Sequence, residues 1–138
     1  MKIVISASIL DLCHAGHLNL LREMRKSGDK SIMVLHDDYS CYKIKDKFPI
    51  WDLKRRIKVL KMTGLVDEIY IAKNPSPANQ FKKIIKKYWG NDLIFIRGND
   101  NLNFPGKEVI DEYKIPIKFV EYTKGVSSTE IKELLLQI

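Results

Sequence analysis

Short apolar runs alternate with longer amphipathic stretches along the whole chain. The apolar runs lie at 3–5 (IVI), 31–35 (SIMVL), 68–72 (EIYIA), 93–96 (LIFI) and 117–120 (IKFV). Most of them are continuous rather than alternating in hydrophobicity, which is typical of parallel strands buried on both faces. Stretches with the helical period lie between and after them, at 15–27, 51–63, 77–89, 105–113 and 127–137.

This alternation predicts an α/β fold, a doubly wound five-stranded parallel sheet in one domain spanning 1–138. Gly28 stands where the first helix should end, and Gly90 stands just before the fourth strand. Ligands of such sheets bind outside the carboxyl ends of the strands. The loops at 7–17, 97–104 and 121–128 are therefore the first places to look for chemistry.

Composition narrows the class of protein. The chain has 138 residues, of which 45% are hydrophobic and 30% charged, a balance typical of a globular domain and not of a disordered chain. No apolar run approaches the roughly 20 residues of a membrane span, and the N-terminus lacks a signal peptide's apolar region. Cys13 and Cys41 therefore predict no disulfide framework. We expect a cytoplasmic protein.

Positive charge is concentrated in one segment. Lys and Arg number 24 and Asp and Glu 17, a net charge of +7, and the segment 43–61 alone contributes eight basic and two acidic residues. Such an excess suits a phosphate-bearing partner (nucleic acid, an anionic membrane or a nucleotide), although an AT-rich genome alone could produce a lysine-rich chain. A second basic run at 82–87 has the spacing of an outer helix face.

The predicted helix at 51–63 has an apolar stripe made of Ile50, Leu53, Ile57 and Leu60. Arg56 lies about 60° from Leu53 around the helix, beside this stripe, whereas Arg55 and Lys58 lie on the far side. Arg56 is thus predicted to point inward toward a ligand. Lys43, Lys45 and Lys47 are expected in a polar loop that either folds over a triphosphate or is simply mobile.

The first loop contains His14 and His17, three residues apart at the start of a helix, with Gly16 between them. Phosphate oxygens can bind to imidazoles and to the amides of a helix N-terminus, and a residue without a side chain lets them come close to the backbone. Three alternatives stay open: purely structural histidines, a zinc site that includes Cys13, and a Cys13 nucleophile. The zinc reading lacks a further Cys/His pair, and the nucleophile would need a hydrogen bond between adjacent residues.

Two further loops offer polar groups. Ser127 and Glu130 have capping-box spacing, so the last helix either is merely capped there or holds a second phosphate with its amides and Ser128. Gly98 and Asp100 follow the fourth strand, where the carboxylate would accept from a ribose or a base or would form an Asx turn.

These residues carry a family resemblance. The run from Asp11 to His17 (DLCHAGH) resembles the His-x-Gly-His signature of the nucleotidyltransferase superfamily. Residues 123–129 (TKGVSST) resemble the Arg-Thr-x-Gly-[Ile/Val]-Ser-Thr signature of cytidylyltransferases, although Tyr122 stands where that arginine is expected. Arg56 followed by Val-Asp-Glu at 66–68, and Gly-Asn-Asp at 98–100, are similar to further segments of those enzymes. Small glycerol-3-phosphate cytidylyltransferases are the most similar.

The resemblance implies a Rossmann-like nucleotidyltransferase that moves CMP from CTP, with Mg²⁺, to a phosphorylated alcohol or polyol and releases pyrophosphate. His14 and His17 would stabilise charge on the α-phosphate, Lys43 or Lys45 would bind the β- and γ-phosphates, and Arg56 would bind the acceptor or triphosphate. Other binding residues implied are Ser8, Ile9, Asp11, Gly16, Gly98, Asp100, Thr123, Gly125, Ser127 and Ser128.

No protein ligand to the metal is implied. A homodimer is implied, without nucleic-acid or membrane partners. Two other functions remain open. One is an adenylyltransferase of the heptose-phosphate type, since those enzymes also have His-Ala-Gly-His at this position. The other is a non-catalytic nucleotide- or nucleic-acid-binding module, whose affinity would fall steeply with salt.

Overall fold

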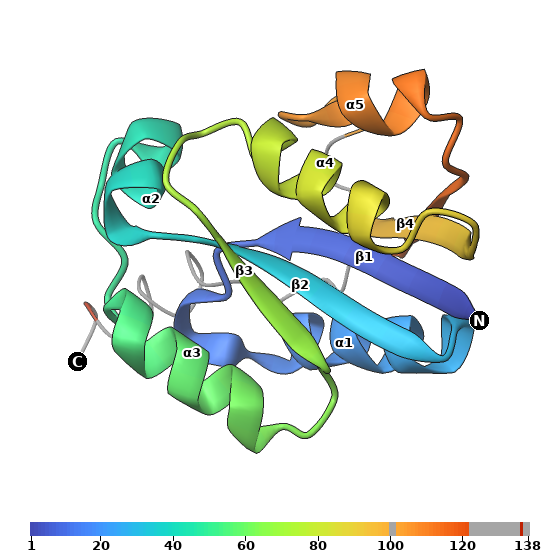
Figure 1. The fold of residues 1–138 in the computed structure, drawn as a ribbon. Helices are drawn as coiled ribbons and strands as arrows, with labels where there is room; N and C mark the ends of the chain where they lie inside the picture. The colour runs from blue at the N-terminus through green and yellow to red at the C-terminus, as the bar shows by residue number, and fades with distance from the viewer. Residues whose placement is uncertain (100–101, 122–135, 137–138) are drawn as a thin grey trace.

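The computed structural model describes residues 1–99, 102–121 and 136. Within them five strands form one sheet in the order β3-β2-β1-β4-β5, and every neighbouring pair is parallel (Figure 1). The strands are β1 (Lys2–Ser8), β2 (Lys30–His36), β3 (Glu68–Ala72), β4 (Asp92–Gly98) and β5 (Ile117–Val120). The predicted α/β class and all five predicted strands are confirmed.

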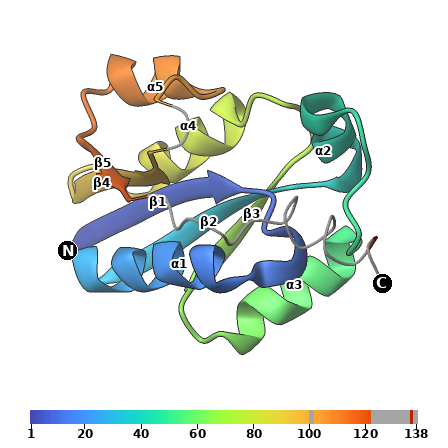
Figure 2. The same ribbon diagram turned by 180° about the vertical axis from the view of Figure 1, so that it is seen from behind.

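Helices cover both faces of the sheet. Figures 1 and 2 show α1 and α3 on one face and α4 and α5 on the other. The helices are α1 (Ala15–Ser27), α2 (Asp38–Lys45), α3 (Leu53–Met62), α4 (Ala78–Lys87) and α5 (Lys107–Glu112), with a 3-10 turn, η1, at Asp11–Cys13. Four of the five predicted helices are confirmed, α1 with the predicted bounds and the other three with shorter ends. The helix predicted at 127–137 lies almost wholly outside the described residues.

Helix α2 occupies a segment for which the sequence predicted a loop, so that expectation was wrong. The helix begins because the Asp37 carboxylate accepts the backbone N–H of Ser40 at 2.8 Å, which caps its first turn. Only Ser40 and Cys41 are buried in it. Without an apolar stripe the helical period is invisible in the sequence.

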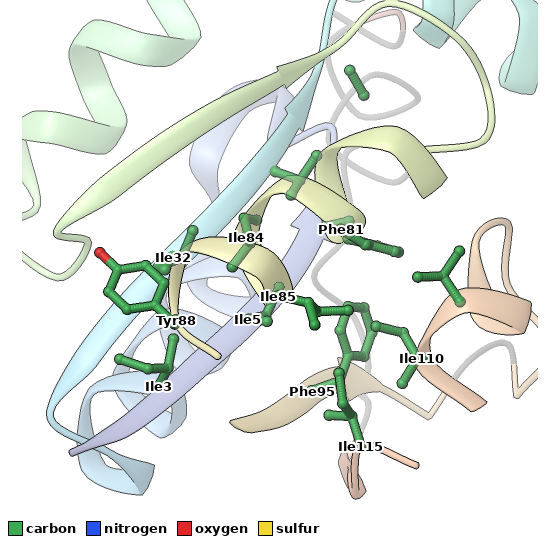
Figure 3. Close-up of a cluster of buried hydrophobic side chains, with 14 of the residues drawn as sticks. Ile3, Ile5, Ile32, Phe81, Ile84, Ile85, Tyr88, Phe95, Ile110 and Ile115 are labelled. Carbon is green, nitrogen blue, oxygen red and sulfur yellow. The ribbon is translucent and has the colours of Figure 1, made fainter. Parts of the chain in front are cut away.

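The core has two parts, one on each face of the sheet. Ile3 and Ile5 of β1 face α4 and α5, while Val4 between them faces α1 and α3, and all three are fully buried. Figure 3 shows the first part, in which Phe81 of α4 meets Phe95 of β4 edge to face, with ring centroids 5.3 Å apart. Burial on both faces explains the continuous apolar runs of the strands.

The topology fixes where ligands can approach. The strand order changes direction at β1, between its neighbours β2 and β4, so the loops that follow these strands meet at one edge of the sheet. Figure 2 shows the start of α1, the start of α3 and helix α2 gathered at that edge. Among the described residues no helix has the length and apolar character needed to cross a bilayer.

We predict that Gly28 is required because a side chain at this position would clash with its neighbours, and not because of its backbone conformation. Its backbone is extended, but an added Cβ would lie 2.6 Å from Val4 Cγ2 and 2.8 Å from the Lys2 carbonyl oxygen. Gly28→Ala should therefore lower the free energy of unfolding by about 1–3 kcal/mol, as overpacking does. Urea unfolding measures this.

Gly64 provides the matched control, because its φ is +68° and nothing lies within 4 Å of an added Cβ. Gly64→Ala should cost only the left-handed backbone penalty of about 1 kcal/mol. Combining each change with Val4→Ala separates the two causes. Val4→Ala should relieve Gly28→Ala in part and leave Gly64→Ala unrelieved, and equal effects on both would contradict the contact.

Candidate active site

The two histidines of the first loop form a stacked pair at the start of α1. The His14 and His17 ring centroids are 3.8 Å apart and their planes differ by 19°. His14 is the N-cap of α1, where its Nδ1 accepts the backbone N–H of Gly16 at 3.1 Å. In the neutral ring the proton therefore lies on His14 Nε2, which is a donor. Both rings stand at the positive end of a helix dipole.

His17 is held in its neutral form. Burial lowers its pKa to about 3, the nearby His14 and Lys45 lower it as well, and Asp11 opposes them. Its Nδ1 is buried and has no hydrogen-bond partner among the described residues. A buried polar atom without a partner costs free energy. A ligand that forms a hydrogen bond with His17 Nδ1 would remove this cost.

The loop that leads to the histidines has a strained backbone. Leu10, Leu12 and Cys13 have φ values of 55°, 64° and 29°, in the left-handed region that favours glycine. Such conformations cost on the order of 1–3 kcal/mol each and persist only where the surroundings impose them. This strain could not be predicted from the residue types, because none of these positions is a glycine.

Asp11 fixes this loop to the segment before α3. Its side chain is buried, and its two carboxylate oxygens accept the backbone N–H groups of Ile50 at 2.9 Å and Trp51 at 3.0 Å. A carboxylate with two such donors binds more strongly than a neutral acceptor would. Asp11 therefore ties the first loop to the chain 39 and 40 residues further on.

Arg56 points inward, as predicted, and only 1% of the residue is exposed. Its NH1 donates to the carbonyl oxygens of Ile9 at 2.8 Å and His36 at 2.7 Å, its Nε to that of Trp51 at 3.1 Å, and its NH2 to Asp38 Oδ1 at 2.7 Å. The guanidinium thus joins three loops. The stripe predicted beside it is wrong at Ile50, which precedes α3 and is exposed.

The two candidate lysines of α2 differ in surroundings. Lys45, at the end of the helix, is near enough to His17 for its charge to lower that histidine's pKa. Lys43 instead lies over the ring of Tyr39, with Nζ 5.5 Å from the centroid, in a cation–π contact. Of the two lysines, Lys45 is therefore the one whose charge acts on His17.

His36 is a third histidine at this edge, and the sequence analysis missed it. It ends β2, is buried, and its Nδ1 lies 2.7 Å from Ser40 Oγ. Burial first, and then Arg56 and Arg97, lower its pKa to about 4, against Asp37 and a backbone hydrogen bond to Asn74. The available signal was its place directly after the apolar run at 31–35, because ligands of such sheets bind at the carboxyl ends of the strands.

The other predicted site residues are more scattered. Ser8 ends β1, Ile9 provides a carbonyl for Arg56, and Gly16 lies in the first turn of α1. Gly98 ends β4 opposite Val120 of β5. Five predicted residues lie outside the described part of the chain, namely Asp100, Thr123, Gly125, Ser127 and Ser128.

Neither alternative for Cys13 gains support. In the described part of the chain no group of three His, Cys, Asp or Glu residues could hold a metal ion. Burial raises the pKa of the Cys13 thiol, so the thiolate that a nucleophile needs is disfavoured. What the site does offer is imidazole donors beside a helix N-terminus and an ammonium group, a set that suits phosphate oxygens.

Comparison with known proteins shows the family of this chain. The family model described as cytidylyltransferase-like matches residues 9–134, so the chain belongs to the cytidylyltransferase-like family. It is 30% identical over 141 residues to ethanolamine-phosphate cytidylyltransferase of Dictyostelium discoideum, covering 98% of this chain and 38% of that protein. It is 24% identical over 139 residues to the bifunctional protein HldE of Geobacter sulfurreducens, covering 99% of this chain and 27% of that protein.

The chain thus spans well under half the length of these curated relatives. Among solved structures, the lipopolysaccharide core biosynthesis protein of Thermoplasma volcanium superposes with a TM-score of 0.65 at 26% identity, covering 91% of this chain and 99% of that one. A putative nicotinate-nucleotide adenylyltransferase of Vibrio parahaemolyticus gives a TM-score of 0.66 at 18% identity, covering 99% and 81% respectively, which shows a shared fold.

The buried histidines predict how stability depends on pH. His17 and His36 have folded pKa values of about 3 and about 4, below the usual 6.5. Between the folded pKa values and 6.5, the unfolded chain binds protons that the folded chain does not. The free energy of unfolding therefore falls as pH falls below about 6.5. Each histidine should raise the unfolding equilibrium constant up to about tenfold per pH unit.

Denaturant unfolding between about pH 7 and pH 5 measures this dependence, because carboxylates titrate mainly below that window. His17→Gln and His36→Gln should each remove about half of the histidine-dependent slope. A slope that neither substitution changes would contradict the neutral, buried state of these rings.

Proposed function

We propose that the protein is a nucleotidyltransferase that transfers CMP from CTP to a phosphorylated alcohol or polyol. An acceptor phosphate oxygen attacks the α-phosphorus, the bond from that phosphorus to the bridging oxygen breaks, and pyrophosphate leaves. Membership of the cytidylyltransferase-like family supports this reaction, as does the likeness to an ethanolamine-phosphate cytidylyltransferase. The proposal places the enzyme in the cytoplasm, as a homodimer.

The stacked pair of His14 and His17 is the observation that carries the proposal. Phosphoryl-type transfer needs positioning and neutralisation of charge more than a covalent nucleophile. Neutral imidazole donors in a partly water-excluded position bind most strongly when negative charge grows on the α-phosphate oxygens. The low pKa of His17 means that the pair stabilises this charge by donation without carrying two positive charges at 3.8 Å.

Lys45 is the residue we assign to the β- and γ-phosphates. It lies at the carboxyl-terminal end of α2 and its charge lowers the pKa of His17, so its ammonium group would add positive charge for the phosphates that follow the α-phosphate. The amides at the start of α1 add a fixed positive field. The family signature at 123–129, which includes Thr123, Gly125, Ser127 and Ser128, is assigned to the same triphosphate by resemblance.

Magnesium would arrive with the nucleotide. Mg²⁺ is commonly held by substrate phosphates, several waters and one or two carboxylates, so a site without a three-residue metal cluster in its described part is compatible with it. When bound there, it would supply positive charge next to the leaving pyrophosphate. The residues of this chain orient the phosphates around it.

An adenylyltransferase acting on a sugar phosphate is the second candidate. The His14-Ala15-Gly16-His17 run also resembles the motif of enzymes of the heptose-phosphate type. Nearly the whole of this chain is similar to 27% of a protein named HldE. Both candidates use the same pair of histidines for the same step. They differ in the base and in the acceptor, which a donor comparison resolves.

The first test is pyrophosphate release with Mg²⁺, using CTP or ATP and a mixture of polyol, ethanolamine and sugar phosphates. Release should require one nucleotide and an acceptor, and His17→Gln should lower kcat by about 100-fold to 1,000-fold, the usual cost of one transition-state donor. Preference for CTP supports the main proposal and preference for ATP supports the second. Release that is indifferent to His17→Gln would contradict both.

A second prediction separates the two lysines. Lys45→Ala should lower kcat/KM for the nucleotide by about tenfold to a hundredfold, the value of a charge-assisted hydrogen bond to phosphate. Lys43→Ala should lower it by less than about threefold, because that ammonium rests on Tyr39.

Steady-state kinetics at constant Mg²⁺ measures both effects, with Lys58→Ala on the outer face of α3 as the control for net charge. Equal losses from Lys43→Ala and Lys45→Ala would contradict the assignment of Lys45.

A further inference from the structure

We propose that Arg56 and Asp11 are positioning residues that hold the strained first loop so that His14 and His17 stay stacked at the start of α1. The inference rests on the proposed nucleotidyl transfer, and it gives Arg56 a different task from the ligand contact that the resemblance implies. Four kinds of observation on the described residues support it: reciprocity, strain, burial and the link to α2.

The two side chains act on the same pair of segments from opposite directions. Asp11, in the first loop, binds the backbone N–H groups of Ile50 and Trp51 before α3. Arg56, in α3, binds the carbonyl oxygens of Ile9 in the first loop and Trp51. One side chain supplies acceptors and the other donors, so the segments cannot separate without breaking three hydrogen bonds, while the bond from Arg56 to Trp51 fixes the guanidinium within its own segment.

Strain lies within the length of chain that this network holds. Leu10, Leu12 and Cys13, between the Ile9 carbonyl and the His14 ring, have positive φ. A loop released at Ile9 and Asp11 would relax toward ordinary backbone angles, and the cap that His14 provides to α1 would move with it. The stacked arrangement of the rings is therefore a consequence of tertiary hydrogen bonds and not of local sequence preference.

Arg56 has little capacity left for a substrate. A guanidinium has five N–H donors, and four hydrogen bonds from Arg56 go to protein oxygens. Its side chain has 0% exposure, whereas the carboxylate partner, Asp38, is 39% exposed. A phosphate contact would require breaking bonds that are short and charge-assisted.

The other two hydrogen bonds of Arg56 extend the network to α2, the helix that carries Lys45. Arg56 binds both the His36 carbonyl at the end of β2 and the Asp38 carboxylate in the first turn of α2. Helix α2 has few buried side chains to hold it, and Lys45 is its last residue. Arg56 therefore also fixes the start of the helix that carries Lys45.

The test compares Arg56→Gln, Arg56→Lys and Asp11→Asn with Arg55→Gln, whose exposed side chain lies one position away on the same helix. The first readout is the set of histidine side-chain ¹H–¹⁵N signals without any nucleotide, which report tautomer and stacking and do not depend on activity. The His14 and His17 signals should shift in the three variants and stay in place in Arg55→Gln. Thermal unfolding gives the folded fraction.

The second readout is kinetics, normalised to the folded fraction. Arg56→Gln and Asp11→Asn should lower kcat by about 100-fold while KM for the nucleotide changes only a few-fold, because misplaced donors affect the transition state most. Arg56→Lys should recover part of kcat, since an ammonium retains some of the bonds. Arg55→Gln should match the wild type in both parameters.

Each other outcome is decisive. Unshifted His14 and His17 signals in folded Arg56 and Asp11 variants would overturn the inference. A large rise in KM with unshifted signals would instead assign Arg56 to the substrate. Shifted signals in a protein whose wild type transfers no nucleotide would leave the positioning role supported and the proposed function refuted.

Discussion

The buried guanidinium of Arg56 is the interaction on which the arrangement of this edge depends. An unpaired buried charge is strongly unfavourable, so burial of Arg56 is possible only because Ile9, His36, Trp51 and Asp38 provide oxygens at 2.7–3.1 Å. Those oxygens belong to the loop after β1, the end of β2, the start of α2 and the entry to α3. One side chain therefore determines the mutual positions of three segments: the loop after β1, the connection from β2 to α2 and the entry to α3.

Much of the fold could be predicted from the sequence because its signals are local. Parallel strands buried on both faces give continuous apolar runs, and all five were found where SIMVL, EIYIA and their counterparts lie. Helix α2 could not be found in this way, because only Ser40 and Cys41 are buried in it and it starts on a capping contact from Asp37. The likeness in fold to solved structures agrees with the predicted doubly wound class.

The site was predicted less completely, for physical reasons. The pairing of His14 and His17 could be predicted because the two residues lie within one helical turn of each other. The inward direction of Arg56 followed from helix geometry, but its partners did not, because hydrogen bonds to backbone carbonyls 5 to 47 residues away leave no trace in residue identity. Nor could the difference between Lys43 and Lys45 be deduced without the helix that carries them.

The central claim, that a nucleoside triphosphate binds with its phosphates against the stacked histidines, has a direct measurement. Titration of ¹⁵N-histidine-labelled protein with CTP and Mg²⁺, followed by the side-chain signals, reports on each ring separately. The account predicts that His14 and His17 shift together and that the pKa of His17 rises from about 3 as phosphate approaches, while His36 changes little. Binding that leaves the His14 and His17 signals unchanged would contradict the account.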